Sequence, residues 1–143
     1  MKDKKIPYFV DLAKAPKILQ MEGLETIVLT GLHGEKMMMV LNVTLPGHTV
    51  PLHQHPHEQI GMVYDGKAKL RIGDEERIVK KGDFYCIPAN VSHSDTAIGD
   101  KPFVMLDIFY PAREDFIEKY EQKNLSSEDF LHRSRSLFRS EAV

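Results

Sequence analysis

Residues 47–66 read GHTVPLHQHPHEQIGMVYDG, and this stretch is the most unusual part of the sequence. It holds four of the seven histidines of the chain. In an extended strand, alternate side chains point the same way and their Cα atoms lie about 6.6 Å apart. His53 and His55 can therefore converge on one metal ion. Prolines flank this pair, so a bend in the chain can bring Gln59 to the same centre.

Around this stretch, short strands alternate with turns rich in glycine and aspartate. The predicted strands span residues 24–29, 36–45, 60–64, 67–72, 76–79, 84–87, 93–98 and 103–110. Strands spaced in this way are typical of a β-sandwich or β-barrel. Because strands and helices do not alternate, a parallel α/β sheet is disfavoured.

Two of these strands show a clear period of two. In 36–45, apolar side chains at alternate positions from Met37 to Leu45 share one face, and the opposite face mixes apolar and polar residues. In 103–110, both faces read as buried, and Asp107 shares one of them with Phe109. Burial raises the pKa of a carboxyl group. Asp107 is therefore a candidate general acid or base; alternatively, backbone donors or a core cation satisfy it.

Composition excludes several classes of protein. The chain has 143 residues, a net charge of −2 and a pI near 6.4, so it lacks the basic surface of a nucleic-acid-binding protein. A single cysteine, Cys86, excludes an internal disulfide and a cysteine-based zinc site. No apolar run is long enough to span a membrane, and the N-terminus lacks a signal-peptide pattern. We expect a cytoplasmic protein with no nucleic-acid or membrane partner.

The composition changes after Pro111. Residues 112–123 are predicted to be helical, and Ser126 or Ser127 is predicted to begin a second helix containing Phe130 and Leu137. The chain is thus expected to form one domain over 1–143: an N-terminal arm (1–23), a barrel core (about 24–111) and a helical tail (112–143).

Two spacings resemble those of the cupin superfamily. The first cupin motif, G-x5-H-x-H-x3-E-x6-G, is matched from Gly47 to Gly66, with Gln59 in place of the glutamate. The second, G-x5-P-x-G-x2-H-x3-N, is matched by Gly82, Pro88 and His93; Asn90 replaces its glycine and Ala97 its final asparagine. The resemblance implies an all-β fold, the double-stranded β-helix or jelly-roll barrel. It also implies one divalent metal ion, either Zn, Ni, Mn, Fe or Co, held by His53, His55, Gln59 and His93.

Gln59 gives this metal site an unusual charge. Three imidazoles and an amide leave the metal charge uncompensated, which favours Lewis-acid chemistry. The same change disfavours oxygen chemistry, for which iron sites usually include a carboxylate. Alternatively, Gln59 does not bind and water takes its place. The neighbours His57 and Glu58 either orient the ligands or are solvated, and we predict that His57 is solvated.

A narrower resemblance involves three segments: HQHPHEQIG (53–61), DIF (107–109) and PAREDF (111–116). They are similar to the small cupins of the pectin degradation protein family (KdgF-like). This resemblance implies action on 4,5-unsaturated monouronates from pectin or alginate. It further implies that Asp107, Phe109 and Arg113 form the substrate site.

The favoured hypothesis is a metal-dependent, isomerase-type ring opening or tautomerisation of a small unsaturated or keto sugar acid. One alternative is a non-catalytic cupin that binds or senses a sugar acid. A third option is a metal-dependent dioxygenase. Small cupins commonly dimerise, so we expect a homodimer that uses the barrel face and the terminal segments.

Overall fold

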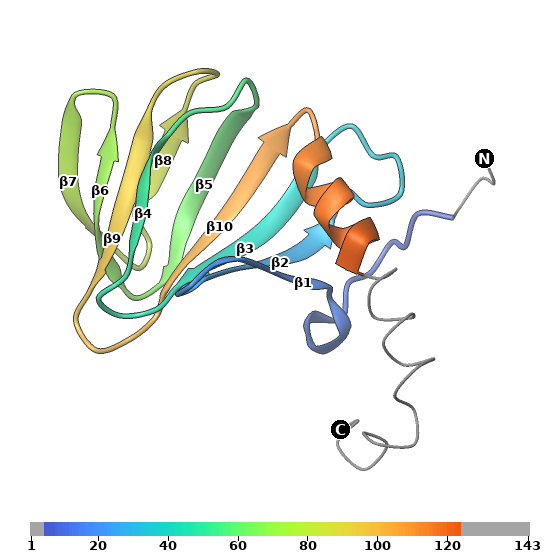
Figure 1. Ribbon diagram of the computed structural model, residues 1–143, viewed down its shortest axis with the longest axis horizontal. Coiled ribbons are helices and arrows are strands. Elements are labelled where there is room, and N and C mark those ends of the chain that lie inside the picture. The colour runs from blue at the N-terminus through green and yellow to red at the C-terminus, as the bar shows by residue number, and fades with distance from the viewer. Residues whose placement is uncertain (1–4, 124–143) are drawn as a thin grey trace, which may run out of the picture.

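The computed structural model describes residues 5–123, in which two antiparallel β-sheets face each other (Figure 1). The larger sheet has the order β1 (Lys17–Met21), β2 (Leu24–Thr30), β3 (Met38–Thr44), β10 (Phe103–Tyr110), β5 (Glu58–Asp65) and β8 (Phe84–Ile87). The smaller has the order β4 (Thr49–His53), β9 (His93–Ile98), β6 (Lys67–Ile72) and β7 (Glu75–Lys80). A 3-10 turn (Leu12–Lys14) precedes β1, and residues 114–123 are helical. The predicted all-β architecture is confirmed.

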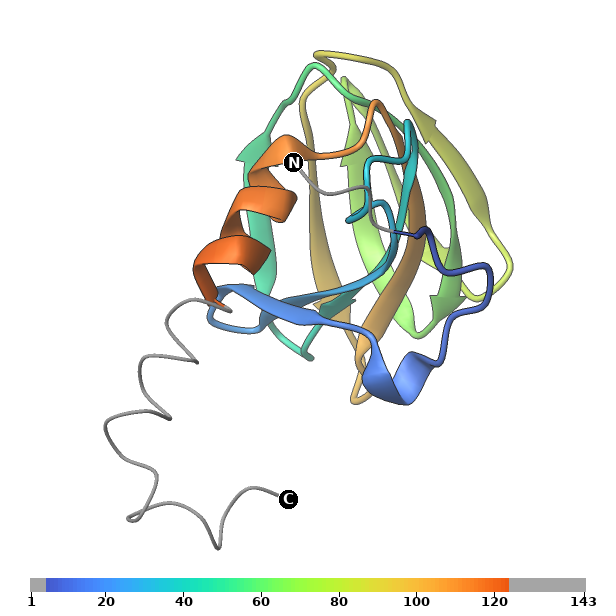
Figure 2. The ribbon, with the colours of Figure 1, turned by 90° about the vertical axis from the view of Figure 1, so that its right-hand side faces the viewer.

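One apolar cluster joins the two sheets, a second packs the helix on the larger sheet, and a cavity lies between the sheets. One cluster joins the sheets through residues such as Val63, Leu70 and Phe103. The other packs the helix over β1, β2 and β3 through Phe116, which contacts a group including Ile18 and Val40. Figure 2 shows this helix beside β1. Burying an aliphatic or aromatic side chain stabilises a fold by roughly 1.5–3 kcal/mol, so these clusters fix the walls of the cavity.

The turn between β5 and β6 shows why the sequence forms hairpins here. Gly66 has a φ of 81°, and a Cβ at this position would lie 2.2 Å from the carbonyl oxygen of Pro102. Both the positive φ and the close approach of the backbone require glycine. The Asp65-Gly66 turn signal in the sequence therefore has a steric cause.

Some elements differ from the sequence-based expectation. β1 lies inside the segment predicted as an arm, and Ile18 is its one residue classed as buried. Val40 and Thr44 of β3 are buried, whereas Met37 and Leu45, which flank β3, are exposed; the sequence pattern marked two faces without assigning one to the core. The helix at 114–123 agrees with the first part of the predicted tail, and the predicted second helix lies outside the described residues. Within residues 5–123, no helix is long and apolar enough to cross a membrane.

Candidate metal centre

Three histidines from the smaller sheet and its connecting loop meet at one point. His53 ends β4, His93 begins β9, and the two are paired in register. His55 follows in the loop. The centroid of the His93 ring lies 4.2 Å from that of His53 and 4.9 Å from that of His55. One ligand nitrogen from each ring lies within 4.8 Å of the others, which suits a shared metal ion.

All three imidazoles are held in the same way. The Nδ1 atom of His53 lies 2.8 Å from the carbonyl oxygen of Pro51, that of His55 lies 3.0 Å from the oxygen of His57, and that of His93 lies 2.9 Å from the oxygen of Val91. A carbonyl oxygen only accepts, so each Nδ1 carries the proton. In the neutral rings, Nε2 then presents a lone pair, as a metal ligand requires.

The environment keeps two of the rings neutral. Burial lowers the pKa of His55 to about 4, and the charge of Arg113 adds to this effect. Burial also lowers the pKa of His93 to about 4. At neutral pH both rings are therefore unprotonated before any metal binds, and the site does not need to release protons from them.

Gln59 completes the site from the opposite sheet. It is buried on β5, and its Oε1 lies 3.1 Å from Nε2 of His55. The Gln59 side chain also lowers the pKa of Asp107, as an amide N–H directed toward a carboxylate does, and this leaves Oε1 facing His55. The lone pairs of Gln59 Oε1 and His55 Nε2 then face each other with no proton between them. Two ligands at about 2.1 Å from one ion, at a right angle, lie about 3.0 Å apart, so the residues fit a divalent cation at this position.

Asp107 lies on β10 and faces the same cavity. It is fully buried, as predicted. Tyr85 Oη donates to its Oδ1 at 2.6 Å, and Asn42 Nδ2 donates to its Oδ2 at 2.7 Å. Burial raises the pKa of Asp107, and the hydrogen bonds from Tyr85 and Asn42 oppose that rise. The result is an oriented carboxylate that is more basic than usual.

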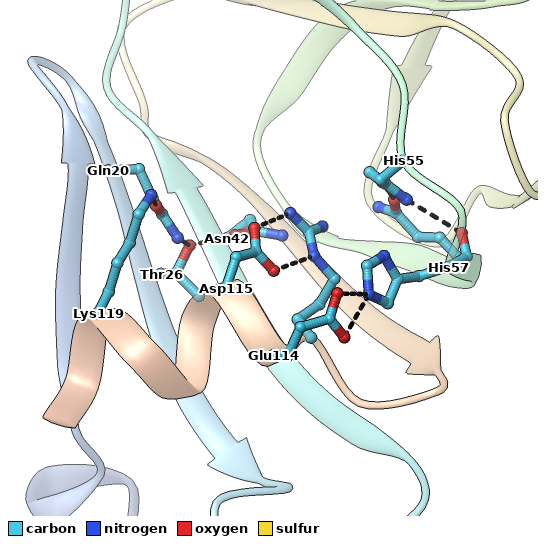
Figure 3. A network of polar contacts seen from close by, with 10 residues as sticks. Gln20, Thr26, Asn42, His55, His57, Glu114, Asp115 and Lys119 are labelled. Carbon is cyan, nitrogen blue, oxygen red and sulfur yellow. Dashed lines mark hydrogen bonds and ion pairs between the residues drawn. The ribbon is translucent and has the colours of Figure 1, made fainter.

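A directional chain of hydrogen bonds leads from the helix to Asn42 (Figure 3), which in turn donates to Asp107. Lys119 Nζ donates to Gln20 Oε1 at 2.5 Å, and Gln20 Nε2 donates to Thr26 Oγ1 at 3.0 Å. The Thr26 hydroxyl then donates to Asn42 Oδ1 at 2.6 Å. Each member has its donor turned toward Asp107, so the orientation of the Asn42 amide is set by the chain. Sequence reasoning missed this chain because its members lie on separate elements and form no local pattern.

Arg113 is held in place just before the helix. Its Nε and Nη2 donate to the two carboxylate oxygens of Asp115 at 2.9 and 2.7 Å. Its guanidinium carbon lies 4.8 Å from the ring centroid of Phe109 and 4.1 Å from that of Phe116. A guanidinium has five N–H donors, so further donors are left for a ligand. The structure thus places the predicted residues Phe109 and Arg113 side by side on the cavity wall.

His57 is buried, and the prediction of a solvated side chain is wrong. Its Nε2 lies 3.0 and 3.1 Å from the carboxylate oxygens of Glu114, at the start of the helix (Figure 3). Its carbonyl oxygen accepts the hydrogen bond from His55. The helix, which is distant in sequence, covers the loop and removes the His57 side chain from solvent. His57 therefore links the helix to a candidate metal ligand.

The cavity has a volume of about 290 Å³ and contains a second buried carboxylate, Asp95, from β9. Thr44 Oγ1 donates to Asp95 Oδ1 at 3.3 Å. Burial, together with the charge of Asp107, raises the pKa of Asp95 to about 7. Sequence reasoning missed Asp95; the available signal was its position two residues after His93, on the same face of a strand.

Comparisons with known proteins agree with this geometry. The cupin domain family matches residues 40–109. The pectin degradation protein KdgF of Dickeya dadantii (strain 3937) is 31% identical over 111 residues, which cover 77% of this chain and 97% of that protein. Two solved structures, an RmlC-like cupin from Shewanella frigidimarina and KdgF from Halomonas sp., each have a TM-score of 0.69 and 24% identity. Both matches cover 77% of this chain. They cover 96% of the Shewanella chain and 98% of the Halomonas chain, and they show a shared fold. The chain therefore belongs to the cupin family, and KdgF is one of its relatives.

Proposed function

We propose that this chain is a metal-dependent isomerase. It opens the ring of a small unsaturated sugar acid, such as a 4,5-unsaturated monouronate from pectin or alginate, and yields a linear keto acid. The observation that carries the proposal is the placement of Asp107, a buried and oriented carboxylate, in the same cavity as the three histidines and Arg113. The sequence relationship to a protein named for pectin degradation supports the choice of substrate.

The residues that would hold the metal are His53, His55, His93 and Gln59. A divalent ion there would supply an electrophile that polarises a hydroxyl or ring oxygen of the sugar. The amide of Gln59 brings no negative charge, and this keeps the electrophile strong. The proposed metal is Zn, Ni, Mn, Fe or Co, since a site of imidazoles with an amide oxygen accepts any of these ions.

Asp107 would move the proton. In a 4,5-unsaturated uronate the ring oxygen is bonded to C5 of the C4=C5 double bond, so the ring is both a hemiacetal and an enol ether. Asp107 accepts the proton of the anomeric hydroxyl while the C1–O bond of the ring breaks, which gives an aldehyde and an enolate at C5. Asp107 then returns the proton to C4, and the enolate becomes a ketone. The sum is an isomerisation, and a carboxylate with a raised pKa suits both transfers.

Arg113 and Phe109 would position the substrate. Asp115 and the two phenyl rings hold the guanidinium rigidly, so that its remaining donors can bind the uronate carboxylate. Phe109 forms an apolar wall beside the sugar ring. Holding the acid group fixes the distance between the anomeric hydroxyl and Asp107.

An NMR time course with 4,5-unsaturated galacturonate tests the proposal. Metal-loaded protein, chelated protein and buffer are compared, and the uncatalysed ring opening is subtracted. We expect metal-dependent acceleration, and we expect Asp107→Asn to keep its metal and lose turnover. Normal turnover by Asp107→Asn would refute the role of Asp107. Tight binding of the sugar acid by the metal-loaded protein without turnover would instead identify a binding cupin.

The proposal includes a homodimer. Tyr8 and Phe9 in the N-terminal arm are 82% and 92% exposed, and Phe84 on edge strand β8 is 76% exposed. On β3 the outward face is the more apolar one. Large apolar side chains exposed in this way are the kind of surface that a protein interface covers. A second copy of the chain is the proposed partner. Light scattering measures the molar mass of the full chain in solution, and a Phe9→Ser/Phe84→Ser variant serves as the comparison.

A further inference from the structure

Asp95 and Asp107 occupy the same layer of the cavity on opposite sheets. Asp95 follows His93 by two residues on β9, and Asp107 precedes Phe109, the register partner of Gln59, by two residues on β10. Because side chains two apart in a strand share a face, each carboxylate lies one step deeper than the candidate metal ligands on its own sheet. A ligand held at the metal would extend between them.

The two carboxylates differ in how well the protein satisfies them. Asp107 receives strong hydrogen bonds on both oxygens. Asp95 receives one long hydrogen bond on Oδ1 from Thr44, and its Oδ2 has no hydrogen-bond or ion-pair partner among residues 5–123. Oδ2 is not among the fully buried side-chain atoms of residues 5–123 that lack a hydrogen-bond partner. Since Oδ2 has no partner, it must be accessible. It therefore opens onto the cavity, which Asp95 lines.

Folding alone does not account for this arrangement. A buried carboxylate without donors destabilises a fold. The register partners of Asp95 are the apolar residues Val50 and Leu70, which offer it no side-chain donor. A free acceptor in a ligand-sized cavity instead matches a donor on the ligand.

We infer that Asp95 Oδ2 accepts a hydrogen bond from a hydroxyl group of the ligand and makes the site specific for polyhydroxy acids. This inference rests on the proposed function. The charges give the ligand a direction: its acid group is attracted to Arg113 and repelled by Asp95 and Asp107. The hydroxyl end therefore points to Asp95. Neither of the two candidate metal clusters of the described residues includes Asp95, which separates this acceptor from the metal ligands.

Binding of D-galacturonate, a saturated and unreactive uronate, tests the inference by calorimetry with metal-loaded protein. We expect Asp95→Leu to weaken binding by about 10- to 100-fold, the range for one hydrogen bond to a charged group. Asp95→Asn keeps one acceptor oxygen and is expected to lie in between. Asp100→Asn, an exposed aspartate in a turn, controls for the loss of charge. Metal content and thermal unfolding are measured for each variant.

Deoxy analogues of galacturonate identify the contact. Removal of the matching hydroxyl should weaken binding to the native chain by the same factor as Asp95→Leu, and should not weaken binding to Asp95→Leu any further. Native-like affinity in a folded, metal-loaded Asp95→Leu variant would overturn the role of Asp95 and leave the proposed function standing. A metal-loaded native chain that neither binds galacturonate nor converts the unsaturated uronate would overturn both this inference and the proposed function.

Discussion

Tyr85 reaches Asp107 across a glycine. Gly61 on β5 is the register partner of both residues, with Asp107 on one neighbouring strand and Tyr85 on the other. A Cβ on Gly61 would lie 2.7 Å from both Tyr85 Oη and Asp107 Oδ1. The missing side chain thus leaves the space in which the 2.6 Å hydrogen bond forms. Three adjacent strands are needed to build this one contact.

Tyr85→Phe is expected to reduce kcat by about tenfold, because Asp107 loses a donor that orients it. In the native chain, the hydrogen bond from Tyr85 lowers the pKa of Asp107. The pKa of Asp107 therefore rises in the variant, which lacks this bond. Since Asp107 acts in its ionised form, the acid limb of the kcat/KM profile moves to higher pH. Rates measured across pH, with metal content verified, check this. An unshifted acid limb would show that Tyr85 has no influence on the base.

Gly61→Ala is expected to destabilise the fold by about 1–3 kcal/mol, because the new methyl group overpacks the site. Its Cβ would also lie 2.3 Å from the carbonyl oxygen of Leu106. Denaturant unfolding measures the change, and Cys86→Ala, exposed on the neighbouring strand, is the control. In the double variant with Tyr85→Phe, the clash between the new Cβ and Tyr85 Oη disappears. The loss of stability in the double variant should therefore be smaller than the sum of the losses in the two single variants. Strict additivity would contradict the contact.

Asp115→Asn is expected to raise KM for the unsaturated uronate by about 5- to 20-fold and to change kcat by less than about threefold. Asp115 holds Arg113 through two hydrogen bonds, and a looser guanidinium binds the substrate carboxylate less well. Steady-state kinetics separate the two constants. Glu118→Gln, exposed on the same helix, is the matched control. A loss confined to kcat would place Asp115 in the chemistry and not in binding.

Without metal, the stability of the fold should depend on pH through His55 and His93. Both have folded pKa values of about 4, below the ordinary value of 6.5. Between these pH values the unfolded chain binds more protons, so their contribution to the free energy of unfolding rises with pH from about 4 to 6.5 and is constant above. The substitution His93→Gln removes the contribution of His93 to this pH dependence. We expect the stability difference between the native chain and His93→Gln, measured by denaturant unfolding in a chelator, to grow over this window. A constant difference would show that His93 has an ordinary pKa.

Metal removal should lower both activity and melting temperature. A ligand at 1,000 times its dissociation constant stabilises the folded state by about 4 kcal/mol. Calorimetric melting before and after chelation measures this, and His53→Ala, which removes one of the candidate ligands, should melt at the same temperature in both conditions. A chelator effect that persists in His53→Ala would place the ion elsewhere.

The sequence by itself determined the local features of this protein. The spacing of His53 and His55, the alternation along 103–110 and the glycine turns each depend on neighbours in the chain, because strand periodicity and turn geometry are local. The burial of Asp107 followed from the same pattern. Neither β1 nor β4 was among the predicted strands. β1 is an edge strand, and its pairing with β2, not its own periodicity, defines it.

The interaction partners of the polar side chains depend on the tertiary fold. Alternation in β3 marked two faces, but only the packing of the sheets showed that the more polar face points inward, toward the cavity. His57 is buried because the helix starting at residue 114 covers it, and Asp95 lies opposite Asp107 because the two sheets face each other. Tyr85, Gly61 and Asp107 meet through the order of β8, β5 and β10 in the sheet. These contacts join residues far apart in sequence, and their energies depend on burial and direction, which only the folded chain supplies.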